Sequence, residues 1–210
     1  MAETYPLALP THTGIARVRL IARDVVGVST SPFNFKQQVY RHQGQRWEAD
    51  ITLPSMKRED AELWSAFLLR LRGAYGTFLL GDPNGGTPRG SASTTPGTPV
   101  VAGASQTGDE LNIDGCPTSA TGYLKAGDYI QLGSGSSARL HKVLEDVNTD
   151  GTGAATLNLW PKITTAPSDN ATVTVSNAQG LFRLASNETM WDIDQASIYG
   201  ITFGAVEAIS

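Results

Sequence analysis

Residues 146–151 match part of a known metal-binding pattern. Their sequence, Asp-Val-Asn-Thr-Asp-Gly, corresponds to the first half of a calcium loop, in which oxygen ligands alternate and a glycine allows a sharp turn. The twelfth position of such a loop needs a bidentate glutamate, but here it is Leu157, and no helix is predicted on either side. We therefore interpret the segment as a hairpin turn rich in Asp, Asn and Gly.

Other residues of the kind that bind phosphate or metals are scattered. Residues 133–137, Gly-Ser-Gly-Ser-Ser, resemble a phosphate loop, but neither Lys-Ser/Thr nor a helix follows, which favours a hairpin tip. His12, His42 and His141 lack metal-site spacing, so no metal site is predicted. Cys116 is the only cysteine, which excludes an intrachain disulfide and predicts a buried or half-buried thiol.

A pair of carboxylates, Asp192 and Asp194, lies on one face of a predicted strand. Two carboxylates can hydrolyse a glycosidic bond. Trp191 and Ile193 occupy the opposite face, so the carboxylates are predicted to face solvent or another subunit. Glycoside hydrolysis stays open as an alternative, although no Gly-x-Ser-x-Gly or other catalytic constellation is found. The sequence thus predicts no enzyme, no catalytic residue and no cofactor.

Arg17, Arg19 and Arg23 form a short basic stripe on another predicted strand. Such a stripe could face nucleic acid, whose binding needs a basic surface. The chain as a whole is acidic, since 16 Lys and Arg stand against 20 Asp and Glu for a net charge of −4. We therefore predict that the arginines pair with acids of a neighbouring strand or subunit.

The amino-acid composition limits the classes of protein to which this chain can belong. The chain has 210 residues, of which 40% are hydrophobic and 17% charged, enough for a real core and incompatible with a disordered chain. Its 22 glycines and 11 prolines predict many turns between short strands. The N-terminus lacks a basic, apolar leader, and the apolar runs are far shorter than the ~20 residues of a membrane span. We expect a protein that needs neither export nor a membrane.

Alternating apolar and polar residues predict three strands before the first helix. They are residues 15–23, 37–42 and 46–53, with a hairpin turn at 43–45. Residues 55–72 are predicted to form a helix, with Ser55 as N-cap and Gly73 as the C-terminal stop. The helix should bury a stripe of four apolar residues, Trp64, Phe67, Leu68 and Leu71. Residues 75–80 should form a further strand.

The rest of the chain predicts a second, smaller β domain inserted into the first. Residues 87–98 are rich in Thr, Pro, Gly and Ser and predict a linker or extended loop. Five short strands without a helical period follow, predicting a small barrel or sandwich: 109–113, 128–132, 139–144, 155–160 and 172–175. Three strands then complete the first domain: 181–184, 190–194 and 197–209.

We therefore predict a discontinuous β domain, 1–90 with 177–210, and an inserted domain, 91–176. The alternative, two domains in linear order, would leave the last three strands without a partner sheet. The predicted fold class is mainly β, with packed antiparallel sheets, one flanking helix and a small barrel or sandwich.

Four segments resemble minor tail proteins of long-tailed bacteriophages, and more narrowly the distal tail protein: WEADITLP at 47–54, DAELWSAF at 60–67, LRG at 71–73 and GTFLLGDP at 76–83. LKAGDYIQLG at 124–133 and LNLWP at 157–161 resemble the small β module of such proteins. The likeness covers residues 15–90 and 120–205.

The resemblance implies a tail-tube-like fold and a hexameric ring in the virion tail, assembled in the host cytoplasm. The ring would join the tail tube to tail-tip hub proteins, and nucleic acid would only pass through it. The small β module would face outward. Residues 2–13 match no known pattern, and we expect an arm that reaches a neighbouring subunit.

A carbohydrate-binding module or adhesin is the alternative function. In that case the inserted domain would hold the glycan, and Tyr123, Tyr129 and Trp160 would stack on its sugar rings. Each of these aromatic residues could equally belong to a core or hinge.

Overall fold

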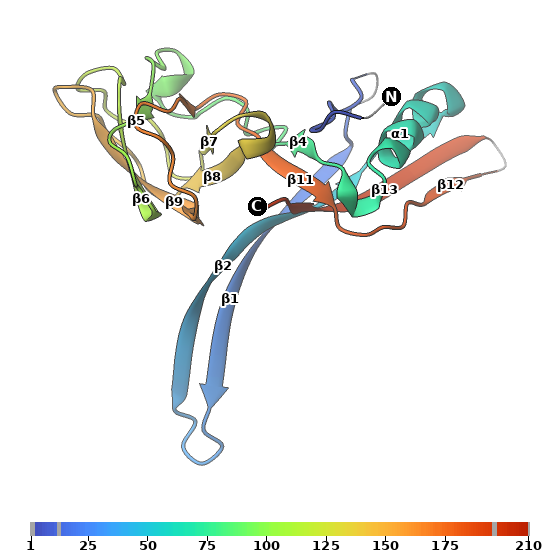
Figure 1. Cartoon of the computed structure of the whole chain (residues 1–210), viewed down its shortest axis with the longest axis horizontal. Helices are drawn as coiled ribbons and strands as arrows, with labels where there is room; N and C mark the ends of the chain where they lie inside the picture. The colour runs from blue at the N-terminus through green and yellow to red at the C-terminus, as the bar shows by residue number, and fades with distance from the viewer. Residues whose placement is uncertain (1–2, 12–13, 195–196, 210) are drawn as a thin grey trace.

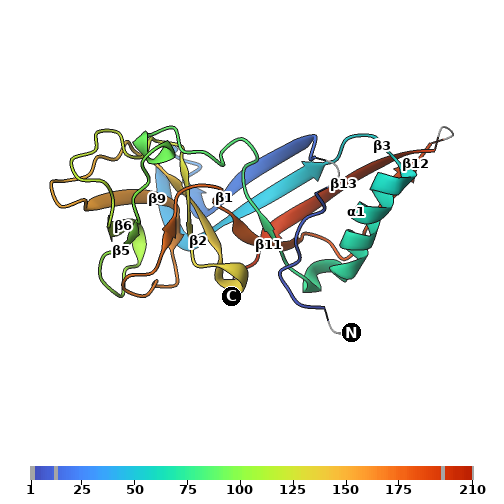
Figure 2. The same cartoon turned by 90° about the horizontal axis from the view of Figure 1, so that it is seen from above.

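The computed structural model describes residues 3–11, 14–194 and 197–209 (Figures 1 and 2). In these residues the chain is mainly β, with two antiparallel sheets and one α-helix, which confirms the predicted fold class. The second sheet lies at one end of the molecule, and the helix α1 lies with β12 at the other (Figure 2).

The first sheet has seven strands from both ends of the chain, in the order β1-β2-β13-β11-β4, and β3 and β12 pair with β13. Their bounds are β1 Arg17–Thr30, β2 Gln37–Thr52, β3 Met56–Lys57, β4 Phe78–Leu80, β11 Gly180–Leu184, β12 Trp191–Ile193 and β13 Ile198–Glu207. In β2 the predicted alternation holds, because Trp47, Ala49 and Ile51 are all buried.

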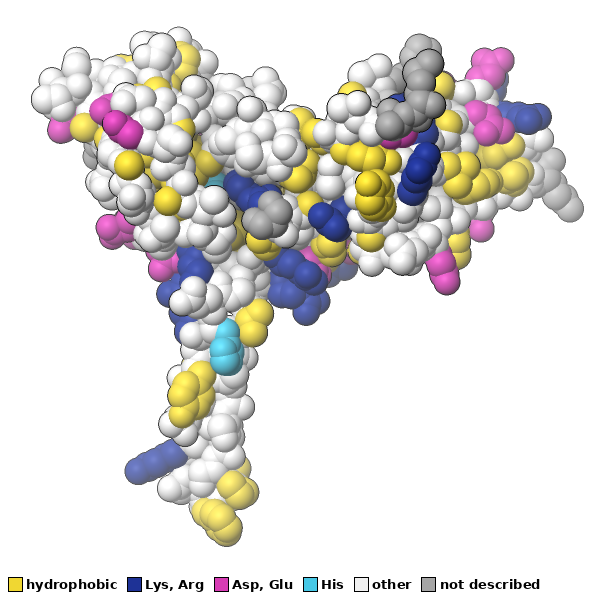
Figure 3. Space-filling model, in the orientation of Figure 1, with side chains coloured by type: hydrophobic (Ala, Val, Ile, Leu, Met, Phe, Trp, Pro, Cys, Tyr) yellow, Lys and Arg dark blue, Asp and Glu magenta, His cyan; other side chains and the backbone are white. Residues whose placement is uncertain are grey.

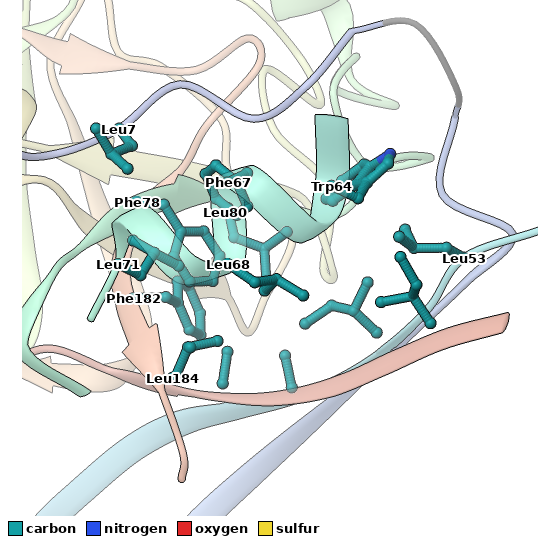
Figure 4. Packing of buried hydrophobic residues seen from close by; sticks show 14 of the residues in the cluster. Leu7, Leu53, Trp64, Phe67, Leu68, Leu71, Phe78, Leu80, Phe182 and Leu184 are labelled. Carbon is teal, nitrogen blue, oxygen red and sulfur yellow. The ribbon is translucent and has the colours of Figure 1, made fainter. Parts of the chain in front are cut away.

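The helix α1 (Arg58–Arg70) covers this sheet and buries the predicted apolar stripe (Figure 4). It begins three residues later than predicted, because Met56 and Lys57 pair with β13 and continue the extended chain. Ser55 is therefore not the N-cap, and Lys57 takes that position without a side-chain hydrogen bond. The helix stops where Arg72 and Gly73 adopt left-handed φ values of 52° and 66°.

The second sheet has six strands in the order β10-β7-β8-β9-β6-β5. Their bounds are β5 Val100–Val101, β6 Gly108–Asp114, β7 Tyr129–Leu132, β8 Arg139–Val143, β9 Ala155–Ile163 and β10 Val173–Thr174. A bridge between Val100 and Thr172 brings the two edges together, so the sheet is nearly a closed barrel. It has its own core, to which β9 contributes Leu157, Leu159 and Ile163.

Three one-turn 3-10 helices lie in the connections: η1 Gly73–Tyr75, η2 Ser91–Ser93 and η3 Gly135–Ser137. Residues 87–98 form an extended loop that packs on the second sheet rather than hanging free, since Pro88, Gly90 and Ala92 are buried. Backbone hydrogen bonds from Ser91 to Gly122 and from Ala92 to Tyr123 fix the loop there.

The chain leaves the first sheet after β4 and returns to it at β11, and these two strands are paired, with Leu80 opposite Gly180. Beside this strand pair, Gly81 lies against Ala178. A Cβ atom on Gly81 would collide with the carbonyl oxygen of Ala178. The Cβ position is fixed by the backbone of Gly81, and the oxygen belongs to the backbone of Ala178, so neither atom can turn away as the end of a flexible side chain could.

We therefore expect Gly81→Ala to lower the free energy of unfolding by ~1–3 kcal/mol, the usual cost of overpacking. Urea unfolding monitored by circular dichroism measures the change. Gly151→Ala is the matched control, because nothing lies within 4 Å of the Cβ position at Gly151. Equal stabilities of the two variants would contradict the assignment of this contact.

Trp47 connects the two sheets. Its indole Nε1 donates a hydrogen bond of 2.9 Å to the carbonyl oxygen of Leu140 in β8. Its ring packs edge-on against Trp160 of β9, with 4.5 Å between centroids. Its backbone N–H donates to the buried carboxylate of Glu207 at 3.0 Å. The side chain of Trp47 thus links β2 to β8 and β9.

The N-terminal segment packs on its own chain over the residues that the structure describes, and its predicted reach to a neighbouring subunit stays a prediction. Leu7 is buried beside Phe78, and its N–H donates to Thr77. Glu3 forms a salt bridge of 2.7 Å with Arg70 at the end of α1. Residues 2, 12 and 13 lie outside the described residues.

Candidate functional site

The most prominent feature of the surface is a two-stranded arm, residues 25–44, which projects from the first sheet away from α1 (Figure 1). The predicted turn at 43–45 is wrong, because β2 runs straight through these residues. The register shifts between Asp24 and Val26, so the extra residues are absorbed as a bulge. The turn lies at residues 31–36, where the N–H of Phe35 donates to the carbonyl oxygen of Ser31 and the N–H of Ser31 donates to that of Lys36.

The arm exposes apolar side chains along its length and at its end (Figure 3). Phe33 and Phe35, in the turn, are 95% and 80% exposed. Val28 and Val39 are cross-strand partners and so share a face of the ribbon. A two-stranded ribbon without a core of its own is marginally stable in water, which indicates that the arm is built to be covered.

The arm is anchored at its base, so its direction relative to the body is fixed. Arg41 forms a salt bridge of 3.2 Å with Asp109 of β6. Asp24, which adjoins the arm, accepts a hydrogen bond of 3.2 Å from the indole of Trp160. Gln45, on the other strand, accepts one of 2.8 Å from the backbone N–H of Lys162. These contacts leave the outer part of the arm free.

A second exposed apolar surface lies at the opposite end of the first sheet. We call it the β12 surface, and it consists of Met190, Trp191, Ile193 and Ile198, whose exposed fractions are 73%, 38%, 56% and 40%. A pocket of about 280 Å³ adjoins it, lined by Leu68, Leu184, Met190 and Phe203 among others. Together the arm and the β12 surface hold eleven of the sixteen large exposed hydrophobic side chains in the described residues.

The glycan-stacking candidates lie in the interior. Tyr123 is fully buried in the core of the second sheet, and its hydroxyl donates to Pro96 at 2.7 Å. Burial raises the pKa of Tyr123 far above its usual value. Tyr129 is 6% exposed, with Lys142 above its ring. Trp160 is half-buried against Trp47. Neither tyrosine presents an open ring face on which a sugar could stack, whereas Trp160 keeps part of its ring exposed.

The other candidate residues are tied into local structure. Asp150 accepts hydrogen bonds from the backbone of Thr152 and Ala154, as a hairpin turn requires. Residues 133–137 connect β7 to β8, which confirms a hairpin tip. Cys116 is buried, and burial raises the pKa of its thiol. Asp192 lies on the exposed strand β12.

The basic stripe pairs with acids of the neighbouring strand, as predicted. Arg19 lies 3.9 Å from Asp50, and Arg23 forms a salt bridge of 2.7 Å with Glu48. Arg46 binds the same carboxylate of Glu48. The hydrogen bond from Arg46 and the adjacent charges hold the pKa of Glu48 below its usual value.

The histidines do not come together. His12 lies outside the described residues, and His42 is on the arm. His141 lines a cleft of about 530 Å³ between the two sheets, with Arg139, Lys162 and Glu207. Its Nδ1 lies 2.6 Å from the carbonyl oxygen of Pro161, so the neutral ring carries its proton there. Burial lowers the pKa of His141 to about 4.

This burial predicts a pH dependence of stability. Between pH 6.5, the ordinary histidine pKa, and about pH 4, His141 is protonated in the unfolded chain but stays neutral in the folded chain. The free energy of unfolding should therefore fall as the pH falls through that range. Glu207 acts in the opposite direction, because burial raises its pKa and protonation relieves the cost of its buried charge.

Comparing His141→Gln with the natural chain isolates the histidine, since Glu207 is common to both. We expect the natural chain to lose more stability than the variant between pH 6.5 and pH 4, measured by urea unfolding. Parallel stability curves would contradict the buried, neutral state of His141.

Comparison with protein-family models finds no match, and comparison with curated proteins finds no similar chain. No helix in the part of the chain that the structure describes is long and apolar enough to cross a membrane. The arm and the β12 surface are therefore the features on which a functional argument can rest. Sequence reasoning missed the arm, although one signal was present: Phe-Asn-Phe at 33–35 places two aromatic residues in a turn.

Proposed function

We propose that this chain is a structural subunit of a bacteriophage tail, and that copies of it form a ring at the distal end of the tail tube. The resemblance of residues 47–83 and 124–161 to distal tail proteins implies six copies. The ring joins the tube to the tail-tip proteins, and the small barrel faces outward.

The observation that carries the proposal is the arm. A side chain such as Phe33, 95% exposed at the end of a projecting ribbon, stabilises nothing in its own chain. Burying it against a partner removes its apolar surface from water. The arm is anchored at its base by Arg41 and points away from its own body, so its partner is another molecule. Projecting elements of this kind serve assembly rather than chemistry.

Ring formation is tested on the purified full chain by negative-stain electron microscopy. We expect closed rings with a central opening. Single small particles at high concentration would contradict self-assembly.

The tail role needs a second test, because other proteins form rings as well. An antibody raised against the second sheet, residues 100–174, should label the distal end of tails in phage particles that contain this chain. Labelling of the capsid, or of no particle at all, would contradict the tail role even if rings form.

A further inference from the structure

We propose that the arm of one copy docks on the β12 surface of the next copy, with Phe33 and Phe35 seated at the adjoining pocket and Lys36 facing the carboxylate of Glu188. This inference rests on the proposed ring and names the two surfaces that would form it. The argument uses the distribution of apolar area, the charge of each surface and the shape of the pocket.

The two surfaces are the main unpartnered apolar areas of the described chain, and they lie on different parts of the same sheet. Phe33 and Phe35 form a projecting knob, whereas Leu68, Leu184 and Phe203 line a hollow. A knob and a hollow on different faces of one chain give a head-to-tail contact, which closes into a ring when the rotation between copies permits.

The charges of the two surfaces are complementary. Residues 25–44 contain Lys36 and Arg41 and no Asp or Glu. Residues 184–203, which carry the β12 surface and line much of its pocket, contain three carboxylates, Glu188, Asp192 and Asp194, and no Lys or Arg. Arg41 is already paired with Asp109, so Lys36 is the cation that the tip brings to the interface. Glu188 lines the pocket itself, which places a carboxylate where the tip would arrive.

A rival pocket beside α1 fits the tip less well. It is lined by Leu63, Phe67 and Arg70, and among the described residues that line it no carboxylate could face Lys36. The guanidinium of Arg70 is also engaged by Glu3 at 2.7 Å. Nucleic acid is the other partner that a basic arm could bind, but Phe33 and Phe35 would then stay exposed unless they stacked on unpaired bases. A second copy accounts for both the apolar and the basic side chains.

Cross-linking in the full chain tests the contact. One preparation carries Phe35→Cys, another carries Met190→Cys, and the two are mixed and treated with a short bismaleimide. The natural Cys116 is 7% exposed and reacts little. We expect cross-linked dimers in the mixture and not in either preparation alone. A chain with both substitutions should give a ladder of products up to the size of the ring.

Leu63→Cys in place of Met190→Cys is the matched control, because Leu63 is exposed on α1 and lines the rival pocket. Cross-linking of Phe35→Cys to this position instead would overturn the proposed docking. If rings form and residue 35 cross-links to neither position, the docking is wrong while the proposed function stands. If no ring forms, the proposed function fails as well.

The charge pair provides an independent test that leaves the apolar contact intact. Lys36→Glu should raise the dissociation constant of self-association roughly fivefold, the effect of losing a partly exposed ion pair. Adding Glu188→Lys should restore it, whereas Arg17→Glu, at the start of β1 and outside the arm, should change nothing. Failure of the double variant to recover would overturn the pairing. So would loss of binding to a DNA oligonucleotide with Lys36→Glu while self-association stays unchanged.

Discussion

Replacing residues 27–40 by Asn-Gly is expected to yield a folded monomer. Val26 and Arg41 are cross-strand partners, so a two-residue turn can connect them without disturbing the remaining register. The deletion removes Phe33 and Phe35, and no residue of either core cluster lies in the deleted segment. We expect self-association to weaken on the order of 100-fold or more, as when the central anchors of an interface are removed.

Sedimentation velocity measures the loss, and thermal unfolding checks that the body is intact. Leu144→Ser is a suitable control, because Leu144 is an exposed apolar residue of the second sheet, 47% exposed, that lies away from both surfaces. It should leave both measurements unchanged. An arm-deleted chain that still sediments as the natural assembly would mean that other surfaces hold the copies together.

Trp47→Ala is expected to have the largest effect on stability. Truncation removes a side chain that is 4% exposed, leaves the carbonyl of Leu140 without its donor and takes away the edge contact with Trp160. We expect a loss of about 3–5 kcal/mol in the free energy of unfolding. Because each sheet keeps its own core, the two should then unfold in separate steps, detected by urea titration.

Trp191→Ala is the matched control for that experiment. Trp191 is 38% exposed on β12, so its truncation should change stability by less than about 0.5 kcal/mol. It should weaken self-association instead, since Trp191 belongs to the β12 surface. A Trp47→Ala chain as stable as the natural one would contradict the role of Trp47 as the joint between the sheets.

The parts of the fold that depend on local periodicity could be predicted from the sequence. Trp47, Ala49 and Ile51 alternate, and the four apolar residues of α1 recur at helical spacing, so the faces they bury are readable without a structure. The start of α1 could not be read, because Met56 and Lys57 are held in a strand by β13, about 140 residues away in the sequence.

The arm escaped prediction for a physical reason. Gln43, Gly44 and Gln45 have the composition of a turn, and the polar residues before them gave no sign that β2 continues. A ribbon with water on both sides needs no alternation of apolar and polar residues, so its sequence carries little of the usual strand signal. Residues 31–34, Ser-Pro-Phe-Asn, do indicate a turn, but a turn alone does not show that the strands on either side of it leave the body as an arm.

The glycan candidates show the opposite error. Because aromatic residues stack on sugars, the sequence allows a binding surface made of Tyr123, Tyr129 and Trp160. The composition of a short strand does not show which of its two faces packs on the core. The structure places Tyr123 and Tyr129 inside, where they pack and form hydrogen bonds. Burial, and not residue type, separates a stacking platform from a core aromatic.

The mass of the full chain in solution tests the central claim most directly. Native mass spectrometry at increasing concentration should reveal a single closed assembly, which for six copies of 22.3 kDa has a mass of about 134 kDa. A chain that stays at 22.3 kDa up to its solubility limit would contradict the claim that the arm exists to join one copy to the next.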